Sequence, residues 1–119
     1  MLRYLLICIV IISINACDVG DSMREASKNN PITNARVLAA DNECLSCHAV
    51  GVTVVGPAWK LVAKKYKDKP GAKAFLIEKI KIGGKGNWNK ETGNQSMPGY
   101  KDRLTEQEIE VLVDYILAL

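Results

Sequence analysis

The feature that most constrains this chain is a short motif, Cys44-Leu45-Ser46-Cys47-His48. Two cysteines separated by two residues and followed directly by a histidine are typical of a c-type haem attachment site. On a helical turn the two thiols lie on one side, where they can add to the two vinyl groups of one porphyrin. The imidazole that follows is then suited to bind the iron. The motif predicts one haem c, covalently held through Cys44 and Cys47, with His48 as an axial ligand.

Two other uses of paired cysteines fit the chain less well. A thioredoxin-like dithiol also has two cysteines at this spacing, but it needs a βαβ context. A structural zinc site needs four ligands, and the chain has no second close pair of cysteine and histidine residues. The sequence therefore favours a haem over a redox dithiol or a zinc ion.

The N-terminal segment predicts export to the periplasm. Arg3 gives the start a single positive charge, and residues 5–14 form an apolar run. This pattern matches a secretory signal peptide, whose apolar region has 7–15 residues. An uncleaved membrane anchor is the alternative, but a span needs about 20 apolar residues. We expect residues 1–16 to be a signal peptide.

The end of the apolar run resembles a bacterial lipobox, Ile14-Asn15-Ala16-Cys17. In that interpretation Cys17 becomes the lipidated N-terminal residue, and its acyl chains anchor the protein to a membrane. Asn15 departs from the small or hydroxylated residue usual at that place, and ordinary cleavage near Ala16 is the alternative. Residues 17–33 are mostly polar and predict a flexible tether.

The remaining segment, residues 34–119, is predicted to be one small all-α domain. Its patterns are helical, and no useful alternation typical of strands is present. We expect about four helices wrapped around one haem: a first helix capped by Thr33 or Asn34 that also carries the haem-binding turn, a second from Pro57 to about Tyr66, a third over 72–82, and a last one that starts with a capping box at Thr105. Residues 85–100 have no periodic pattern and are expected to form a long loop.

The candidates for the second axial ligand are few. His48 is the single histidine, and the chain has three methionines. Met1 lies in the predicted leader and Met23 in the predicted tether, whereas Met97 lies beside a proline in the long loop. Met97 is therefore the preferred sixth ligand, because a thioether is a soft ligand that raises the potential of haem iron. A lysine ligand and an open site remain as alternatives.

Taken together, these residues resemble the class I cytochromes c, in particular the small bacterial monohaem kind. The resemblance is carried by the haem-binding motif, residues 55–60, residues 79–84, Trp88, Met97-Pro98 and the amphipathic last helix. It implies that the Pro57 carbonyl accepts a hydrogen bond from His48. It also implies that the Trp88 indole faces a haem propionate, with a half-buried loop aromatic as the alternative. The spacing of nine residues from Trp88 to Met97 is longer than in compact members of the family.

Charge along the chain is uneven. Residues 60–90 contain ten lysines and two acids, whereas residues 102–114 contain five acids and one arginine. Such asymmetry can orient a protein toward an acidic docking face on a redox partner, although a solvated surface is the plainer alternative. Nucleic acid is a poor fit for an exported haem protein.

The predicted function is one-electron transfer between respiratory partners by a monomer with both axial positions of the iron filled. We therefore expect an electron carrier and no enzyme. A small peroxidase and a gas-binding or sensing module are the alternatives. Both of these need a labile sixth ligand, which means that Met97 would have to leave the iron.

Overall fold

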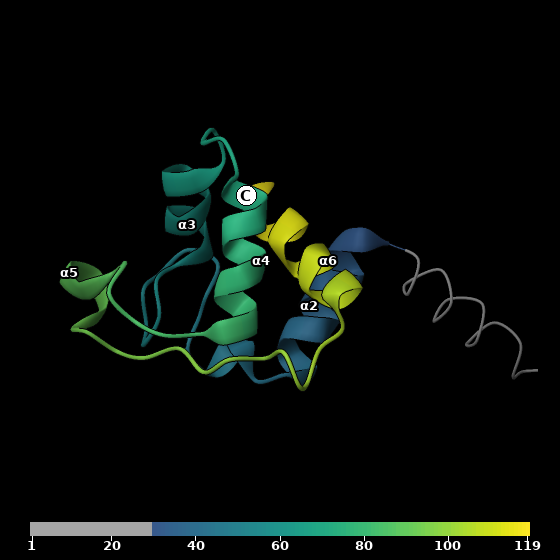
Figure 1. Ribbon diagram of the computed structural model, residues 1–119, viewed down its shortest axis with the longest axis horizontal. Coiled ribbons are helices and arrows are strands. Elements are labelled where there is room, and N and C mark those ends of the chain that lie inside the picture. Colours follow the sequence, from purple (N-terminus) through teal and green to yellow (C-terminus); the bar gives the residue numbers. More distant parts are fainter. Residues whose placement is uncertain (1–29) are drawn as a thin grey trace, which may run out of the picture.

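A computed structural model describes residues 30–119. Within this range the backbone forms helices and connecting loops, without strands (Figure 1). The elements in chain order are α2 (Pro31–Asp41), the short 3₁₀ helix η1 (Cys44–Ser46), α3 (Trp59–Tyr66), α4 (Ala72–Ile82), α5 (Asn89–Thr92) and α6 (Glu106–Leu117). The predicted signal peptide, most of the predicted tether and Cys17 lie outside the described residues.

The all-α prediction is confirmed, and several predicted boundaries hold. The third predicted helix matches α4 residue for residue, and Gly83 ends it with a positive φ of 69°. The capping box at Thr105 is present at the start of α6, where the Thr105 side chain accepts from the Glu108 amide and the Glu108 carboxylate accepts from the Thr105 amide. Both features follow from local rules about turn residues and unpaired helix-end amides.

Three predicted helix boundaries were wrong, two of them in the first helix. The first helix begins at Pro31 and is capped by Asn30, so that residues 31–33, assigned to the tether, are helical. The second begins at Trp59 rather than at Pro57. The first helix also ends before the haem-binding turn, because Asn42 ends α2 and Glu43 turns the chain with a left-handed φ of 59°. A proline and a capping side chain explain the earlier start.

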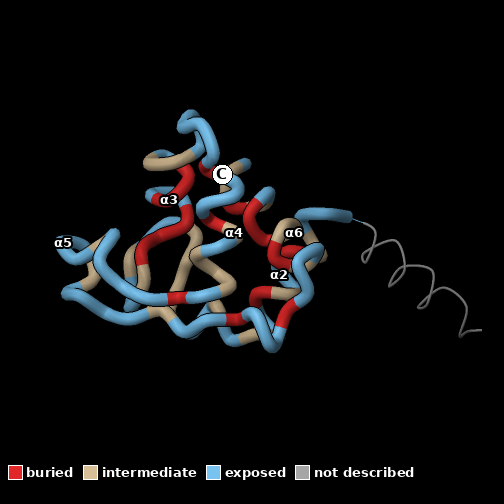
Figure 2. The backbone as a smooth tube through the Cα atoms, in the orientation of Figure 1, coloured by how far each residue is buried: buried red, intermediate tan, exposed pale blue. Residues whose placement is uncertain are grey.

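The core lies around α6, which packs against α2, α3 and α4. Ile109 and Val113 are the large side chains that are completely enclosed, and they occupy the apolar stripe of α6 as its periodicity predicts. Figure 2 shows buried positions on these four helices and on the segments that join them, such as residues 57–58, 83, 100 and 104, while α5 is largely exposed. The loop after α5 runs past the end of α4 and leads back to α6 (Figure 1). This route brings residue 97 to the haem-binding side of the domain.

Candidate haem site

A cavity of about 320 Å³ opens beside the core, and the six residues predicted to bind the haem all line it. They are Cys44, Cys47, His48, Pro57, Trp88 and Met97. These residues come from a 3₁₀ turn, the segment before α3 and the loop between α4 and α6. The fold thus brings together positions that are up to 53 residues apart in the sequence.

The motif itself forms a tight turn. The His48 amide donates to the Cys44 carbonyl at 2.9 Å, and the Cys47 amide donates to the same oxygen at 3.2 Å. Neither Cys44 nor Cys47 forms a disulfide bond, and both are only partly buried. The turn therefore presents two available thiols and one imidazole to a single cavity.

The orientation of His48 is set by Pro57. The distance from His48 Nδ1 to the Pro57 carbonyl oxygen is 2.8 Å. A carbonyl only accepts hydrogen bonds, so Nδ1 carries the proton, and Nε2 of the neutral ring keeps a lone pair for a metal. This is the contact that the family resemblance implies. Such partners fix the tautomer and the plane of a ligating imidazole.

Two neighbours of His48 were missed by the sequence analysis. The ring of Trp59 lies nearly parallel to the imidazole, with centroids 6.1 Å apart and an interplanar angle of 23°. In addition, a Cβ at Gly56 would lie 2.8 Å from both ring nitrogens. Only glycine allows the backbone to approach the imidazole this closely. The glycine before Pro57 was visible in the sequence, but nothing there indicated which side chain it would face.

Met97 is held by its backbone. Its amide donates to the Gly84 carbonyl at 3.0 Å, and the Gly84 amide donates to the Met97 carbonyl at 2.8 Å. Next to this pair, a Cβ at Gly83 would lie 2.6 Å from the carbonyl carbon of Pro98. The two glycines at the end of α4 therefore also allow the backbone around Met97 to approach closely. Their position at a helix end did not indicate this second role.

Trp88 lies at the start of α5 and packs edge-on against Tyr66, with ring centroids 6.3 Å apart. It is partly buried and borders the cavity. Tyr66 in turn stacks on Phe75 of α4 at 5.2 Å. The prediction of a featureless loop from residue 85 to 100 missed α5, because four helical residues are too few to produce a periodic pattern.

Four charged side chains also line the cavity: Glu43, Lys79, Lys85 and Arg103. Arg103 pairs with Glu43 at 3.6 Å, and the Lys79 ammonium donates to the Gly83 carbonyl at 2.9 Å. Burial raises the pKa of the Cys44 thiol, an effect that its own backbone contacts and Arg103 oppose. Cys44 is therefore a thiol at neutral pH when it carries no haem.

The lining fits a haem. Most of the wall is aliphatic or aromatic, from Val62, Leu76, Ile80, Leu112 and Ile116, which suits the apolar faces of a porphyrin. Two thiols, an imidazole and a thioether border the same space, and these are the groups that c-type haems use for attachment and ligation. Among residues 30–119, no three cysteine, histidine or acidic side chains cluster as they would around a bare metal ion.

The helical fold and this donor set define a small protein with one covalently bound haem. The chain belongs to the cytochrome c family, which its residues 32–119 match. It is 42% identical over 82 residues to cytochrome c2 of Rhodocyclus tenuis, which covers 69% of this chain and 88% of that protein. It is also 42% identical over 82 residues to cytochrome c-552 of Nitrosomonas europaea, covering 69% of this chain and 75% of that one.

Solved structures give the same result. The crystal structure of Nitrosomonas europaea cytochrome c552 matches with a TM-score of 0.62 at 40% identity, covering 71% of this chain and 98% of that one. The class 1 cytochrome MtoD from Sideroxydans lithotrophicus ES-1 matches with a TM-score of 0.64 at 32% identity, covering 73% and 94%. The expectation of a small monohaem class I cytochrome c is therefore confirmed.

Membership of this family fixes the general function. Cytochromes c carry a covalently bound c-type haem, and Cys44 and Cys47 fit its attachment motif. The chain is a small electron carrier rather than an enzyme, and it works with redox partners. Bacterial class I cytochromes c are generally exported to the periplasm. Across residues 30–119, every helix is too short or too polar to span a bilayer.

Proposed function

We propose that this protein is a one-electron carrier in which His48 and Met97 occupy both axial positions of the haem iron. The observation that carries the proposal is that both side chains border one cavity and both are fixed from outside it. Pro57 holds His48 at 2.8 Å, and Gly84 pairs with Met97 through two backbone hydrogen bonds. A bound haem supplies one-electron cycling between the ferric and ferrous states. The chain supplies two ligands that need not move when the charge of the iron changes.

The other cavity residues have supporting roles in this proposal. Cys44 and Cys47 hold the haem through thioethers, and Trp88 directs its indole N–H toward a propionate. Pro57 keeps Nε2 of His48 available to the iron. A neutral His/Met pair favours the reduced state and so raises the potential. An electron carrier with fixed ligands loses little energy to rearrangement, which suits repeated transfer between partners.

Substitution of Met97 tests the ligand assignment. The oxidised protein is expected to show a long-wavelength thioether–iron charge-transfer band, and Met97→Ala should abolish it and lower the midpoint potential. Met23→Ala is the matched control, because it removes a methionine outside the predicted haem domain. Absorption spectroscopy and a redox titration of the haem-loaded proteins make the measurement. If Met97→Ala keeps both the band and the potential, Met97 is not the ligand.

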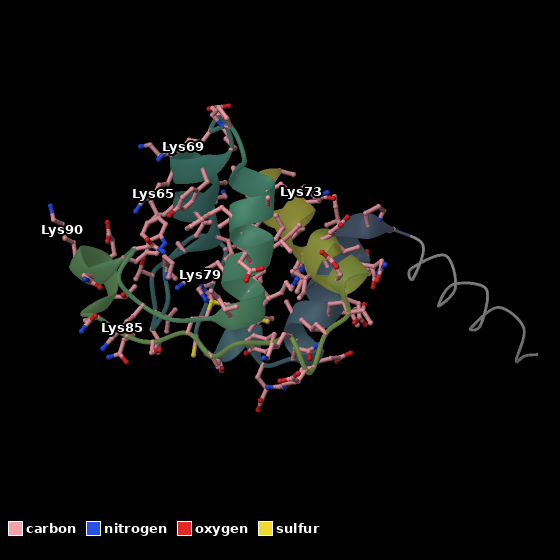
Figure 3. All side chains as sticks on the ribbon, viewed as in Figure 1. Lys65, Lys69, Lys73, Lys79, Lys85 and Lys90 are labelled. Atoms are coloured by element: carbon pink, nitrogen blue, oxygen red, sulfur yellow. The ribbon has the colours of Figure 1, made fainter. Side chains whose placement is uncertain are left out.

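We also propose that the protein docks through part of its basic region. The predicted region spans residues 60–90, but not all of its lysines are equivalent. Lys73 is paired with Asp114 at 3.0 Å and with Glu110 at 3.7 Å. Lys85 lines the cavity, and Lys90 lies on the outer edge of α5; both are on the opposite side of the molecule from α2 (Figure 3). We assign docking to the α5 side, next to the haem, where a short path for the electron is available.

The N-terminal part of the proposal concerns the membrane. We propose that the chain is cleaved before Cys17, which becomes the new N-terminal residue and is lipidated. The haem domain then works as a monomer on a tether. The lipobox-like sequence supports this, together with the liability of a free thiol on an exported protein. Mass spectrometry of the mature N-terminal peptide tests it: a diacylated or triacylated Cys17 is expected, and an unmodified thiol would contradict the anchor.

A further inference from the structure

Lys65 differs from its neighbours in the basic region. It lies in the last turn of α3 and is partly buried, whereas Lys64 and Lys67 are exposed. Its ammonium donates to the Asn87 backbone carbonyl at 2.8 Å and lies 4.1 Å from the centroid of the Trp88 ring. Figure 3 shows Lys65 on the part of the molecule between α3 and α5. One side chain thus binds the loop by a charge-assisted hydrogen bond and by a cation–π contact.

This contact is prominent because the loop has few others. Within residues 85–96, the backbone hydrogen bonds run inside the loop, such as those from residues 91 and 92 to Trp88. Among the hydrogen bonds of the described residues, the one from Lys65 to Asn87 alone ties residues 85–96 to the rest of the domain. The next tie along the chain is the backbone pair between Met97 and Gly84. The chain between these two ties carries α5.

Aromatic packing reinforces the same junction. Trp88 meets Tyr66 edge-on, and the Lys65 ammonium lies 5.7 Å from the Tyr66 ring as well. A cation over an aromatic face gains strength where water is partly excluded. Removing the ammonium would leave the Asn87 carbonyl without its partner, and Trp88 would keep only its ring contact with Tyr66 and its apolar packing against the core. The loop would then open more often.

We propose that Lys65 is a positioning residue that holds the Trp88–Met97 loop against α3 and thereby keeps the sixth position of the iron closed. Its charge serves inside the molecule rather than at a docking surface. The consequence for the iron rests on the proposed ligation by Met97, whereas the attachment of the loop does not. The two parts can therefore be tested separately.

Amide hydrogen exchange of the haem-loaded protein tests the attachment. Lys65→Met should speed exchange in peptides covering residues 85–97 about tenfold, while peptides from α6 keep their protection. Lys64→Met is the matched control, because it removes the same charge from the same helix at an exposed position. Lys65→Arg should restore most of the protection, because a guanidinium also donates to carbonyls and stacks on aromatic rings. Equal exchange in Lys65→Met and the wild type would overturn the proposal.

Binding of free imidazole to the ferric protein tests the effect on the iron. An intact Met97 ligand must be displaced, so the wild type should bind imidazole weakly and Lys65→Met about tenfold more tightly. Lys64→Met should match the wild type. Met97→Ala separates the two hypotheses: if it binds no better than the wild type, the ligation by Met97 fails, whereas the exchange result on the loop stands. If Lys65→Met loosens the loop without changing imidazole affinity, the role of Lys65 at the iron is rejected.

Discussion

His48 is held by contacts on several sides, and each contact depends on a single neighbouring residue. Pro57 accepts from Nδ1, Trp59 lies alongside the ring, and Gly56 leaves the space that a Cβ would fill. In the proposed ligation by His48 this rigidity matters, because the potential and the stability of the ferric and ferrous states both depend on the orientation of the axial ligand.

Gly56→Ala tests this tight packing. The added methyl group would overlap the His48 ring, and overpacking of this kind costs about 1–3 kcal/mol. We expect the free energy of unfolding to fall by that amount and the midpoint potential to shift, as measured by guanidinium titration and voltammetry of the haem-loaded protein. Gly51→Ala is the control, because a Cβ there would meet no atom within 4 Å. Equal stability of the two variants would show that the imidazole is free to move.

The sequence predicted which residues line the cavity where chemistry restricts the choice, and their proposed roles stay predictions. The cysteines and His48 follow from one motif, and Met97 follows from the scarcity of methionine and histidine. Gly56 and Lys65 were not predictable, because their roles depend on which residues the fold places opposite them. A lysine in a basic stretch has the same appearance in the sequence whether it faces solvent or an indole ring.

At the level of whole elements, α6 organises the domain and its start is the best-specified helix end. The Thr105 hydroxyl accepts a hydrogen bond from the Glu108 amide, and the Glu108 carboxylate accepts one from the Thr105 amide, which forms a capping box. Hydrogen bonds from the Thr105 amide and hydroxyl lower the pKa of Glu108. The charged form is therefore favoured in the folded protein, and its contribution to stability is lost as the pH falls through the folded pKa.

Glu108→Gln isolates that pH dependence, because glutamine can complete a capping box without a charge. Near neutral pH the wild type should be more stable than the variant. The difference should shrink as the pH drops below the ordinary glutamate pKa of 4.5 and through the lowered folded value. Denaturant titrations at a series of pH values make the comparison. Glu106→Gln removes a carboxylate from the same turn but keeps the box. A pH-independent gap between Glu108→Gln and the wild type would contradict the assigned cause.

The accuracy of the helix predictions follows from the signals available. The bounds of α4 were predictable because Gly71 and Gly83 enclose an apolar pattern, and both have positive φ. The break between α2 and the haem-binding turn was not, because Glu43 adopts a left-handed conformation that glutamate seldom takes. α5 has only four residues, too short for any period to be visible.

For the whole molecule, the uneven charge matters most for encounter with partners. Reduction of ferricyanide, a small trianion, by the ferrous protein should slow as salt rises, because attraction between opposite charges is screened. Substitution of both Lys85 and Lys90 with glutamine should slow it several-fold at low salt. Lys73→Gln should change it little, because Asp114 and Glu110 already offset that charge. Stopped-flow measurements give the reduction rates. An equal loss of rate in Lys73→Gln would show that the rate depends on net charge alone and not on the positions of the lysines.

The overall architecture was more predictable than its details. One motif, an all-helical pattern and a small core together indicated a domain built around a haem, and the cavity beside α6 matches that expectation. The closeness of residue 97 to the haem-binding turn was expected from the scarcity of other candidate ligands and from the family resemblance. It results from the route of a loop whose sequence carries no periodic pattern.

Addition of carbon monoxide to the ferrous wild-type protein, combined with the long-wavelength spectrum of the ferric form, tests the central claim most directly. A carrier closed by His48 and Met97 should show the thioether–iron band when oxidised and should leave its ferrous spectrum unchanged at low carbon monoxide concentration. Absence of the band together with ready carbon monoxide binding would contradict a closed iron and would favour a gas-binding or peroxidase-like haem.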